Sequence, residues 1–362
     1  LPMPPCSRCS SAQTTAPVSW AAATSVSSSS GRSVCRSTTL NTVQRRIREF
    51  KIPPVYAILV VVFVSAVVLD LFFGRGQITS STILTNMLVR SVALGIVAMG
   101  QTFVMLSASI DLSVAYLISV TAVMASFLMR GDPARVPMAV ASVFAIGAFV
   151  GLINGLVVSK LRVNPFIATL GVGLVLKGVL NASFETFIGA VPRSFQTLGY
   201  GTIGPVPISI LVLLGVTVVA AFVLRRTRFG AHLYAVGGSE EVARLSGLRT
   251  DRVIILAHII CSMTAVLTGL FVVSRLRSGA PWVGTDGLYD LESIAAVVVG
   301  GTALSGGKGG VAGTLAGVVI FGILDTAFNQ LGVDTFLKQV LRGSIIILAV
   351  ASYTIRSRMK AS

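Results

Sequence analysis

Two long apolar runs constrain the fold of this chain more than any other feature. Residues 55–73 (VYAILVVVFVSAVVLDLFF) and 208–224 (ISILVLLGVTVVAAFVL) contain one charged residue between them. About 20 apolar residues in a helix cross the ~30 Å hydrocarbon layer of a bilayer. The runs are continuous, whereas barrel strands alternate apolar and polar residues. Charged residues make up 12% of the 362 residues, against about 25% in soluble domains. The sequence therefore predicts an all-α, polytopic membrane protein.

We predict about ten transmembrane helices within one domain, residues 51–360. They lie near 55–73, 87–107, 113–129, 138–158, 166–182, 208–224, 253–273, 291–304, 311–330 and 336–355. Lys and Arg gather in alternate connections, most densely in 225–252, and such a bias marks the cytoplasmic side. Both termini are therefore predicted to lie in the cytoplasm. Because the basic residues lie in connections, the net charge of +16 does not indicate a nucleic-acid-binding surface.

The first 50 residues differ from the rest of the chain. They are rich in Ser, Thr, Ala and Pro without a periodic apolar face, which predicts a disordered N-terminal extension. Cys6 and Cys9 form an isolated C-x-x-C pair, and the chain has two histidines, His232 and His258. A structural zinc site needs four ligands. We therefore predict no metal and no cofactor.

A glycine-rich stretch at residues 300–313, GGTALSGGKGGVAG, suggests a phosphate-binding loop. A P-loop needs Gly-x-x-x-x-Gly-Lys followed by Ser or Thr, whose hydroxyl binds Mg²⁺. Here Thr302 occupies the first glycine position and Gly309 follows Lys308. The stretch is better explained as a tight turn between two helices, and no catalytic residues are indicated. We predict that the chain is not an enzyme.

Glycines recur every four residues in two predicted spans. One series is Gly147, Gly151 and Gly155, and the other is Gly309, Gly313 and Gly317. Small residues let membrane helices approach closely, so both series predict helix packing. IDLSVAYLISV (110–120) and YDLESIAAVVV (289–299) also look alike. This pairing favours an inverted repeat of spans 2–5 against spans 7–10.

The connection 225–252 contains a predicted short helix in the segment GGSEEVARLSGL. Ser239 is a good N-cap, Glu240 and Glu241 suit the first turn, and Gly247 suits the position after the last turn. Val242 and Leu245 share one face. The predicted helix, residues 240–246, has seven residues, which are too few for a stable isolated helix. The helix therefore either rests on the bilayer surface or docks against a cytoplasmic partner.

This segment resembles the coupling helix of ribose-type permease subunits of bacterial ATP-binding-cassette importers. GQTFVMLSASIDLSV (100–114), NPFIATLGVGL (164–174) and AAVVVGGTALSGGKGGVAGTLAGVV (295–319) resemble the same family in order and spacing. The chain departs from the family pattern at Ala108, Ser109 and Ala115, where glycines are common. The resemblance implies an ATPase-coupling helix formed by Gly238, Ser239, Glu240, Glu241, Val242, Ala243, Arg244, Leu245, Ser246 and Gly247.

The resemblance also implies a function and a set of partners. The expected function is translocation of a ribose-like monosaccharide across the bacterial cytoplasmic membrane. The expected partners are a second permease chain (identical or paralogous), membrane lipid, ATP-binding-cassette subunits that bind ATP and Mg²⁺, and a periplasmic or lipid-anchored sugar-binding protein. Polar residues within spans are candidates for the translocation path: Gln101, Thr102, Ser107, Asp111, Asn154, Asn164, Thr169 and Asn329. Hydrogen bonding between helices is the simpler explanation for each of them.

Two alternatives remain open at this stage. A permease of the same class could carry a branched-chain amino acid or another polar nutrient. An ion-coupled secondary transporter would need ionisable residues deep in the membrane. Asp70, Arg90, Glu292 and Asp334 fall near predicted span ends, so Asp111 and Asp325 are the acids expected at depth. This placement disfavours ion coupling.

Overall fold

A computed structural model describes residues 54–73, 78–334, 336–344 and 347. The N-terminal extension with its cysteines, both termini and the end of the predicted span 336–355 lie outside these residues. The helices, in chain order, are α2 (Pro54–Phe73), α3 (Ser81–Leu106), α4 (Val114–Met129), the 3-10 helix η1 (Pro133–Arg135), α5 (Val136–Ser159), α6 (Pro165–Ser183), α7 (Arg193–Tyr200), α8 (Ile208–Arg226), α9 (Arg228–Gly238), α10 (Glu240–Leu245), α11 (Thr250–Leu276), α12 (Val283–Asp286), α13 (Tyr289–Val299) and α14 (Val311–Gln330). Residues 336–344 are also helical.

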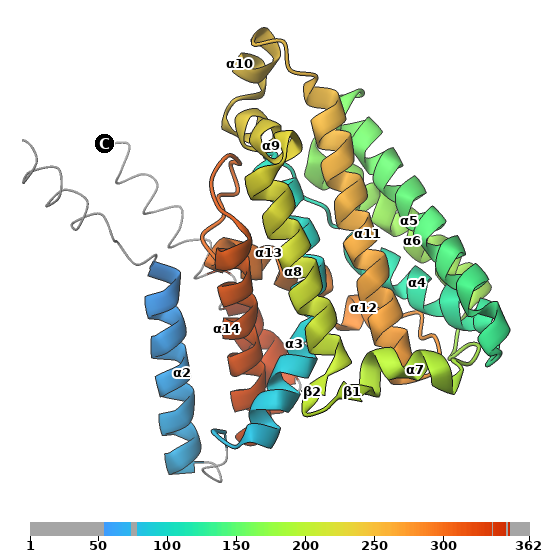
Figure 1. Ribbon diagram of the computed structural model, residues 1–362, viewed down its shortest axis with the longest axis vertical. Helices are drawn as coiled ribbons and strands as arrows, with labels where there is room; N and C mark the ends of the chain where they lie inside the picture. The colour runs from blue at the N-terminus through green and yellow to red at the C-terminus, as the bar shows by residue number, and fades with distance from the viewer. Residues whose placement is uncertain (1–53, 74–77, 335, 345–346, 348–362) are drawn as a thin grey trace, which may run out of the picture. The chain divides into compact units, whose positions relative to one another are not determined.

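Seven of these helices are long and apolar enough to cross a bilayer: α2, α3, α5 (counted together with η1), α6, α8, α11 and α14. The prediction of a polytopic all-α membrane protein is confirmed (Figure 1). Helix α4 is shorter, at 16 residues, or about 24 Å. Helix α13 has 11 residues, or about 16 Å, roughly half of the hydrocarbon thickness.

The predicted span 291–304 is therefore wrong at its C-terminal end. Helix α13 stops at Val299 because Gly300 and Gly301 begin a turn, in which Gly301 has a φ of 91°. Irregular backbone at membrane depth is tolerated only where protein covers it. Thr302 and Ala303 are almost wholly buried. The loop 300–310 is thus covered by the bundle where it leaves α13.

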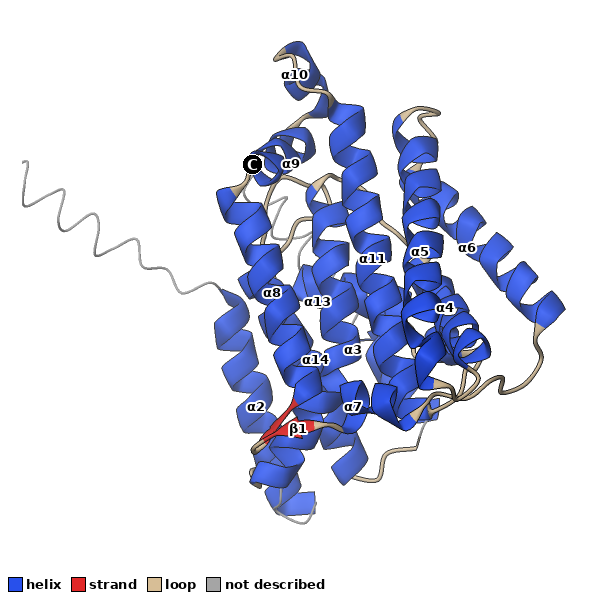
Figure 2. Cartoon of the chain, turned by 45° about the vertical axis from the view of Figure 1, so that its right-hand side comes forward, coloured by secondary structure: helices blue, strands red, loops and turns tan. Residues whose placement is uncertain are grey.

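Helix α11 lies at the centre of the bundle and packs against α3, α4 and α5 (Figures 1 and 2). The series Gly147, Gly151 and Gly155 on α5 faces α11. A methyl group on Gly151 would lie 2.7 Å from Cα of Ile259 and 2.9 Å from the carbonyl oxygen of His258. The two backbones approach so closely because no side chain separates them.

The second glycine series brings α14 against α13. A methyl group on Gly313 would collide with the carbonyl oxygen of Gly300, and one on Gly317 with that of Ala296. The order of a long helix, a short helix and a helix with spaced glycines occurs twice, in α3–α4–α5 and in α11–α13–α14. The inverted repeat itself stays a prediction.

Several elements were not predicted from the sequence, namely α7, a small hairpin, α9, η1 and α12. Helix α7 and a small hairpin lie between α6 and α8, and in the hairpin β1 (Thr202–Ile203) pairs antiparallel with β2 (Val206–Pro207) (Figure 2). Helix α9 follows α8 directly, because Thr227 caps it by accepting a hydrogen bond from the amide of Gly230. The hairpin and α9 lie at opposite ends of α8.

Candidate functional site

The short helix predicted in the connection 225–252 is present as α10. The Ser239 hydroxyl accepts a hydrogen bond from the amide of Val242 at 3.3 Å, and Gly247 follows the helix with a φ of 83°. Ala243 is buried, whereas the side chains of Val242 and Leu245 are 61% and 83% exposed. Helices α9 and α10 project at one end of the bundle (Figure 1). The helix thus presents two adjacent apolar side chains to its surroundings.

An ion-pair network holds α10 in place. Glu240 bonds with Arg162 of the α5–α6 connection at 2.7 Å and with Arg244 at 2.6 Å. Lys160, in the same connection, pairs with Asp251 in the first turn of α11. All these side chains are at least partly exposed, so each pair contributes only about 0–1 kcal/mol. The network orients a helix that is too short to be stable alone.

A contact between three backbone segments, which we call the glycine junction, connects α9 to the bundle. It comprises Leu106 at the end of α3, Gly237 at the end of α9 and Gly307 in the loop 300–310. The Gly307 amide donates a hydrogen bond to the Leu106 carbonyl at 3.0 Å. A methyl group on Gly237 would collide with that carbonyl oxygen. The predicted tight turn at 300–310 is therefore a packing element that contacts the end of α9, and α10 follows directly after this contact.

A side chain of α9 reinforces this contact. The Tyr234 hydroxyl donates a hydrogen bond to the Gly309 carbonyl at 2.9 Å. Burial raises the pKa of Tyr234, which nearby Arg225 lowers in part. The hydroxyl therefore remains a donor at neutral pH.

Asp111, one of the two acids expected at depth, is wholly buried in a polar network. Its Oδ1 accepts hydrogen bonds from the amide and the hydroxyl of Ser113 at 2.9 and 2.6 Å, just before α4. Its Oδ2 lies 3.5 Å from Nδ1 of His258, whose Nε2 lies 3.0 Å from the Ser109 hydroxyl. Asn154 of α5 donates to the Ser113 hydroxyl at 2.8 Å. These contacts join the 107–113 loop to α4, α5 and α11.

The other path candidates occupy several different places. Gln101 accepts a hydrogen bond from Cys261, and the hydroxyls of Thr102 and Thr314 lie 2.8 Å apart. Thr169 accepts from the amide of Leu112. Ser107 is buried at the end of α3, and Asn164 caps α6 by accepting from the amide of Phe166. Asn329 lines a small cavity beside α3. The roles of these residues in transport stay predictions.

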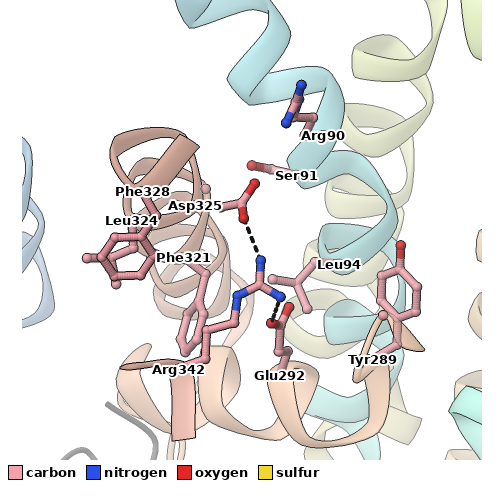
Figure 3. A pocket seen from close by; sticks show the side chains of 12 residues that line it. Arg90, Ser91, Leu94, Tyr289, Glu292, Phe321, Leu324, Asp325, Phe328 and Arg342 are labelled. Carbon is pink, nitrogen blue, oxygen red and sulfur yellow. Dashed lines mark hydrogen bonds and ion pairs between the residues drawn. The ribbon is translucent and has the colours of Figure 1, made fainter. Parts of the chain in front are cut away.

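The structure brings together charges that lie far apart in the sequence, of which Arg90 and Glu292 were predicted near span ends and Asp325 at depth. A cavity of about 230 Å³ lies among α3, α13, α14 and residues 336–344 (Figure 3). The Arg342 guanidinium pairs with Glu292 at 2.8 Å and with Asp325 at 2.5 Å. Each charge interrupts an apolar run, which was the available signal, but their convergence required the fold. The full lining is Arg90, Ser91, Leu94, Gly287, Tyr289, Glu292, Phe321, Gly322, Leu324, Asp325, Phe328 and Arg342.

A multi-pass bundle of apolar helices with a capped helix projecting at one end has the architecture of a membrane transport subunit. A protein-family model described as "Branched-chain amino acid transport system / permease component" matches residues 83–350. The chain belongs to this permease family. No solved structure gives a significant match.

Curated relatives cover most of the bundle. The chain is 38% identical over 272 residues to the ribose import permease protein RbsC of Escherichia coli (strain K12), which is 74% of this chain and 84% of the relative. It is 36% identical over 270 residues to RbsC of Bacillus subtilis (strain 168), which is 73% and 82% of the two chains. It is 33% identical over 288 residues to the galactose/methyl galactoside import permease protein MglC of E. coli (strain K12), which is 74% and 85%.

Proposed function

We propose that this chain is the permease subunit of an ATP-driven importer of monosaccharides in a bacterial inner membrane. The proposal rests on two observations together, the exposed helix α10 and the names of the relatives. A capped, anchored helix presents Val242 and Leu245 away from the bundle, and the relatives are import permeases named for ribose and galactose. ATP and Mg²⁺ are bound by separate ATP-binding-cassette subunits, against which α10 docks. The permease therefore transports and does not hydrolyse.

The remaining partners follow from the same proposal. A sugar-binding protein outside the membrane delivers the substrate to a dimer of permease chains. Closure of the ATPase domains displaces α10, and the glycine junction transmits this displacement to α3 and to the loop 300–310. A second candidate substrate is a branched-chain amino acid, which the description of the matching family favours. The sugar is preferred because the individual relatives are named for sugars.

The docking role is tested by association with candidate ATP-binding-cassette subunits. Leu245→Asp and Val242→Asp place a charge on the exposed face of α10, so we expect at least tenfold weaker co-purification. Ile203→Asp is the matched control, because Ile203 is 63% exposed and lies in the hairpin at the other end of α8. Unchanged association of both α10 variants would refute docking through this face.

The substrate is tested in proteoliposomes that contain the permease, the ATPase subunits and a candidate binding protein. We expect ATP-dependent uptake of labelled ribose or galactose, and none of labelled leucine. ATP-dependent leucine uptake without sugar uptake would replace the sugar by an amino acid. Uptake that persists without any ATPase subunit would favour an ion-coupled carrier.

A further inference from the structure

The cavity around Arg342 has the composition of a small-ligand site. Its polar side chains come from segments far apart in the sequence, with Arg90 on α3, Glu292 on α13, Asp325 on α14 and Arg342 in 336–344 (Figure 3). Charges within a membrane protein are costly and mark functional positions by default. Two cations and two anions surround the same space, so a neutral ligand meets no net charge there.

Of the four charged side chains around the cavity, Arg342, Glu292 and Asp325 pair with one another, and Arg90 does not pair with them. Arg342 bridges Glu292 and Asp325, and Asp325 Oδ2 accepts a further hydrogen bond from the Asn329 amide at 3.1 Å. Arg90 makes no ion pair or side-chain hydrogen bond with any residue in the described part of the chain, yet it lines this cavity and the adjacent one that Asn329 also lines. A guanidinium has five N–H donors. Arg90 is exposed in the described part of the chain, so a solute in the cavity can reach its donors.

The size and lining of the cavity define the class of that solute. Its volume of about 230 Å³ lies below the roughly 300–1,000 Å³ of sites for drug-sized ligands. A single sugar ring suits this space better than an oligosaccharide. Sugar hydroxyls both donate to carboxylates and accept from guanidinium groups. Phe321 and Tyr289 supply aromatic surface for the apolar C–H face of such a ring.

The position of the cavity fits a step in transport. Arg90 lies nine residues after the start of α3, or about 14 Å along the helix axis. The other end of α3 reaches the glycine junction beside α9. The cavity therefore opens in the half of the bundle remote from α10, which is the half that a delivered solute enters first.

We propose that this cavity binds one monosaccharide ring during transport, with Arg90, Glu292, Asp325 and Arg342 as hydrogen-bonding partners of its hydroxyls. This inference rests on the proposed function and adds a site to it. The simpler explanation of the cluster is structural, since an ion pair between helices can fix their register. A test must therefore separate ligand binding from helix packing.

Ligand-observed saturation-transfer NMR on the purified full-length permease in nanodiscs provides such a test, because it detects weak binding. The probes are D-ribose, D-galactose and L-leucine, each alone. We expect a sugar signal that falls at least fivefold in Arg90→Gln and in Asp325→Asn. The matched control is Asp132→Asn with Arg135→Gln, which removes an exposed ion pair in η1 away from the cavity. Arg90→Gln removes no ion pair and is expected to fold normally.

A charge swap separates the two explanations. Asp325→Arg combined with Arg342→Asp and Glu292→Gln keeps one ion pair, leaves no second acid beside position 342 and moves the donors and acceptors. If the cavity binds sugar, the swap restores the thermal stability lost in Asp325→Asn but not the sugar signal. Restoration of both would overturn the site and leave the cluster structural. A sugar signal that is absent, or unchanged in Arg90→Gln and Asp325→Asn, would also overturn it.

The outcome for the site is distinguishable from that for the proposed function. ATP-dependent sugar uptake by the reconstituted wild-type transporter is measured in parallel. Normal uptake in Arg90→Gln and Asp325→Asn would reject the site and preserve the function. A signal with leucine and none with sugars would reject the monosaccharide at both levels.

Discussion

The contact between α5 and α11 yields a stability prediction with a direct structural magnitude. In Gly151→Ala the added methyl group would lie 2.7 Å from Cα of Ile259, whereas carbon atoms prefer separations of about 3.5–4.0 Å. The neighbouring atom is backbone, so α5 and α11 must move apart by about 1 Å. Overpacking of this kind costs typically 1–3 kcal/mol.

Matched glycines remove the effect of helix propensity. Alanine is favoured over glycine in a helix by about 0.5–1 kcal/mol, and this gain applies equally to Gly178→Ala in α6 and Gly215→Ala in α8. A methyl group on either of these glycines meets no atom within 4 Å. We therefore expect Gly151→Ala to be about 1–3 kcal/mol less stable than both controls, since the propensity gain cancels.

Thermal unfolding of the detergent-solubilised chain, followed by fluorescence-detected size-exclusion chromatography, measures this difference. The two controls should melt at or above the temperature of the unmodified chain, and Gly151→Ala should melt below both. If Gly151→Ala matched Gly178→Ala, the close approach of α5 to α11 would be wrong. The interpretation of the spaced glycines as a packing device would then fail as well.

Three further outcomes are expected. Ala108 has a φ of 59°, so Ala108→Gly relieves about 1–2 kcal/mol of left-handed strain and costs about 0.4–1 kcal/mol in chain entropy; its melting temperature should rise slightly, and a clear fall would contradict this. Asp111→Ala leaves the Ser113 amide without its acceptor, which costs about 1–3 kcal/mol of stability. This variant should therefore melt at a lower temperature than Asp111→Asn, which keeps an acceptor oxygen, and equal melting temperatures would show that the network contributes little. In a chain without its natural cysteines, Ser239→Cys should resist an impermeant maleimide in intact cells and react after permeabilisation, whereas Ile203→Cys should react in intact cells; the reverse pattern would invert the topology.

The features that the sequence predicted well depend on neighbouring residues. The apolar runs predicted the long helices because a bilayer demands about 20 apolar residues per span. The N-cap at Ser239 and the glycine at 247 predicted α10 because caps act within one turn. The predicted segment 240–246 differs from Glu240–Leu245 by one residue.

The features that it missed depend on distant residues. Glu292 and Arg342 are 50 positions apart, and neither residue alone indicates the other as its partner. Helix α13 was predicted too long because the apolar run continues beyond Val299, and only the turn at Gly301 shows that the helix has ended. Helix α9 was missed because Arg228–Gly238 contains three glycines and has the composition of a loop.

Helix α3 and the loop 300–310 connect the cavity around Arg342 with the glycine junction, so that movement at one can reach the other. Helix α3 extends from Arg90 at the cavity to Leu106 at the glycine junction, 16 residues or about 24 Å along one rigid element. The loop 300–310 joins α13, which carries Glu292, to α14, which carries Asp325, and it touches α9 through Gly307. A displacement of α9 and α10 therefore reaches residues on three sides of the cavity through continuous backbone. Because a half-length α13 ends in a glycine turn rather than in a further helical turn, the loop can shift without breaking helical hydrogen bonds. We expect such a shift to change the contacts of the Arg342 guanidinium with Glu292 and Asp325.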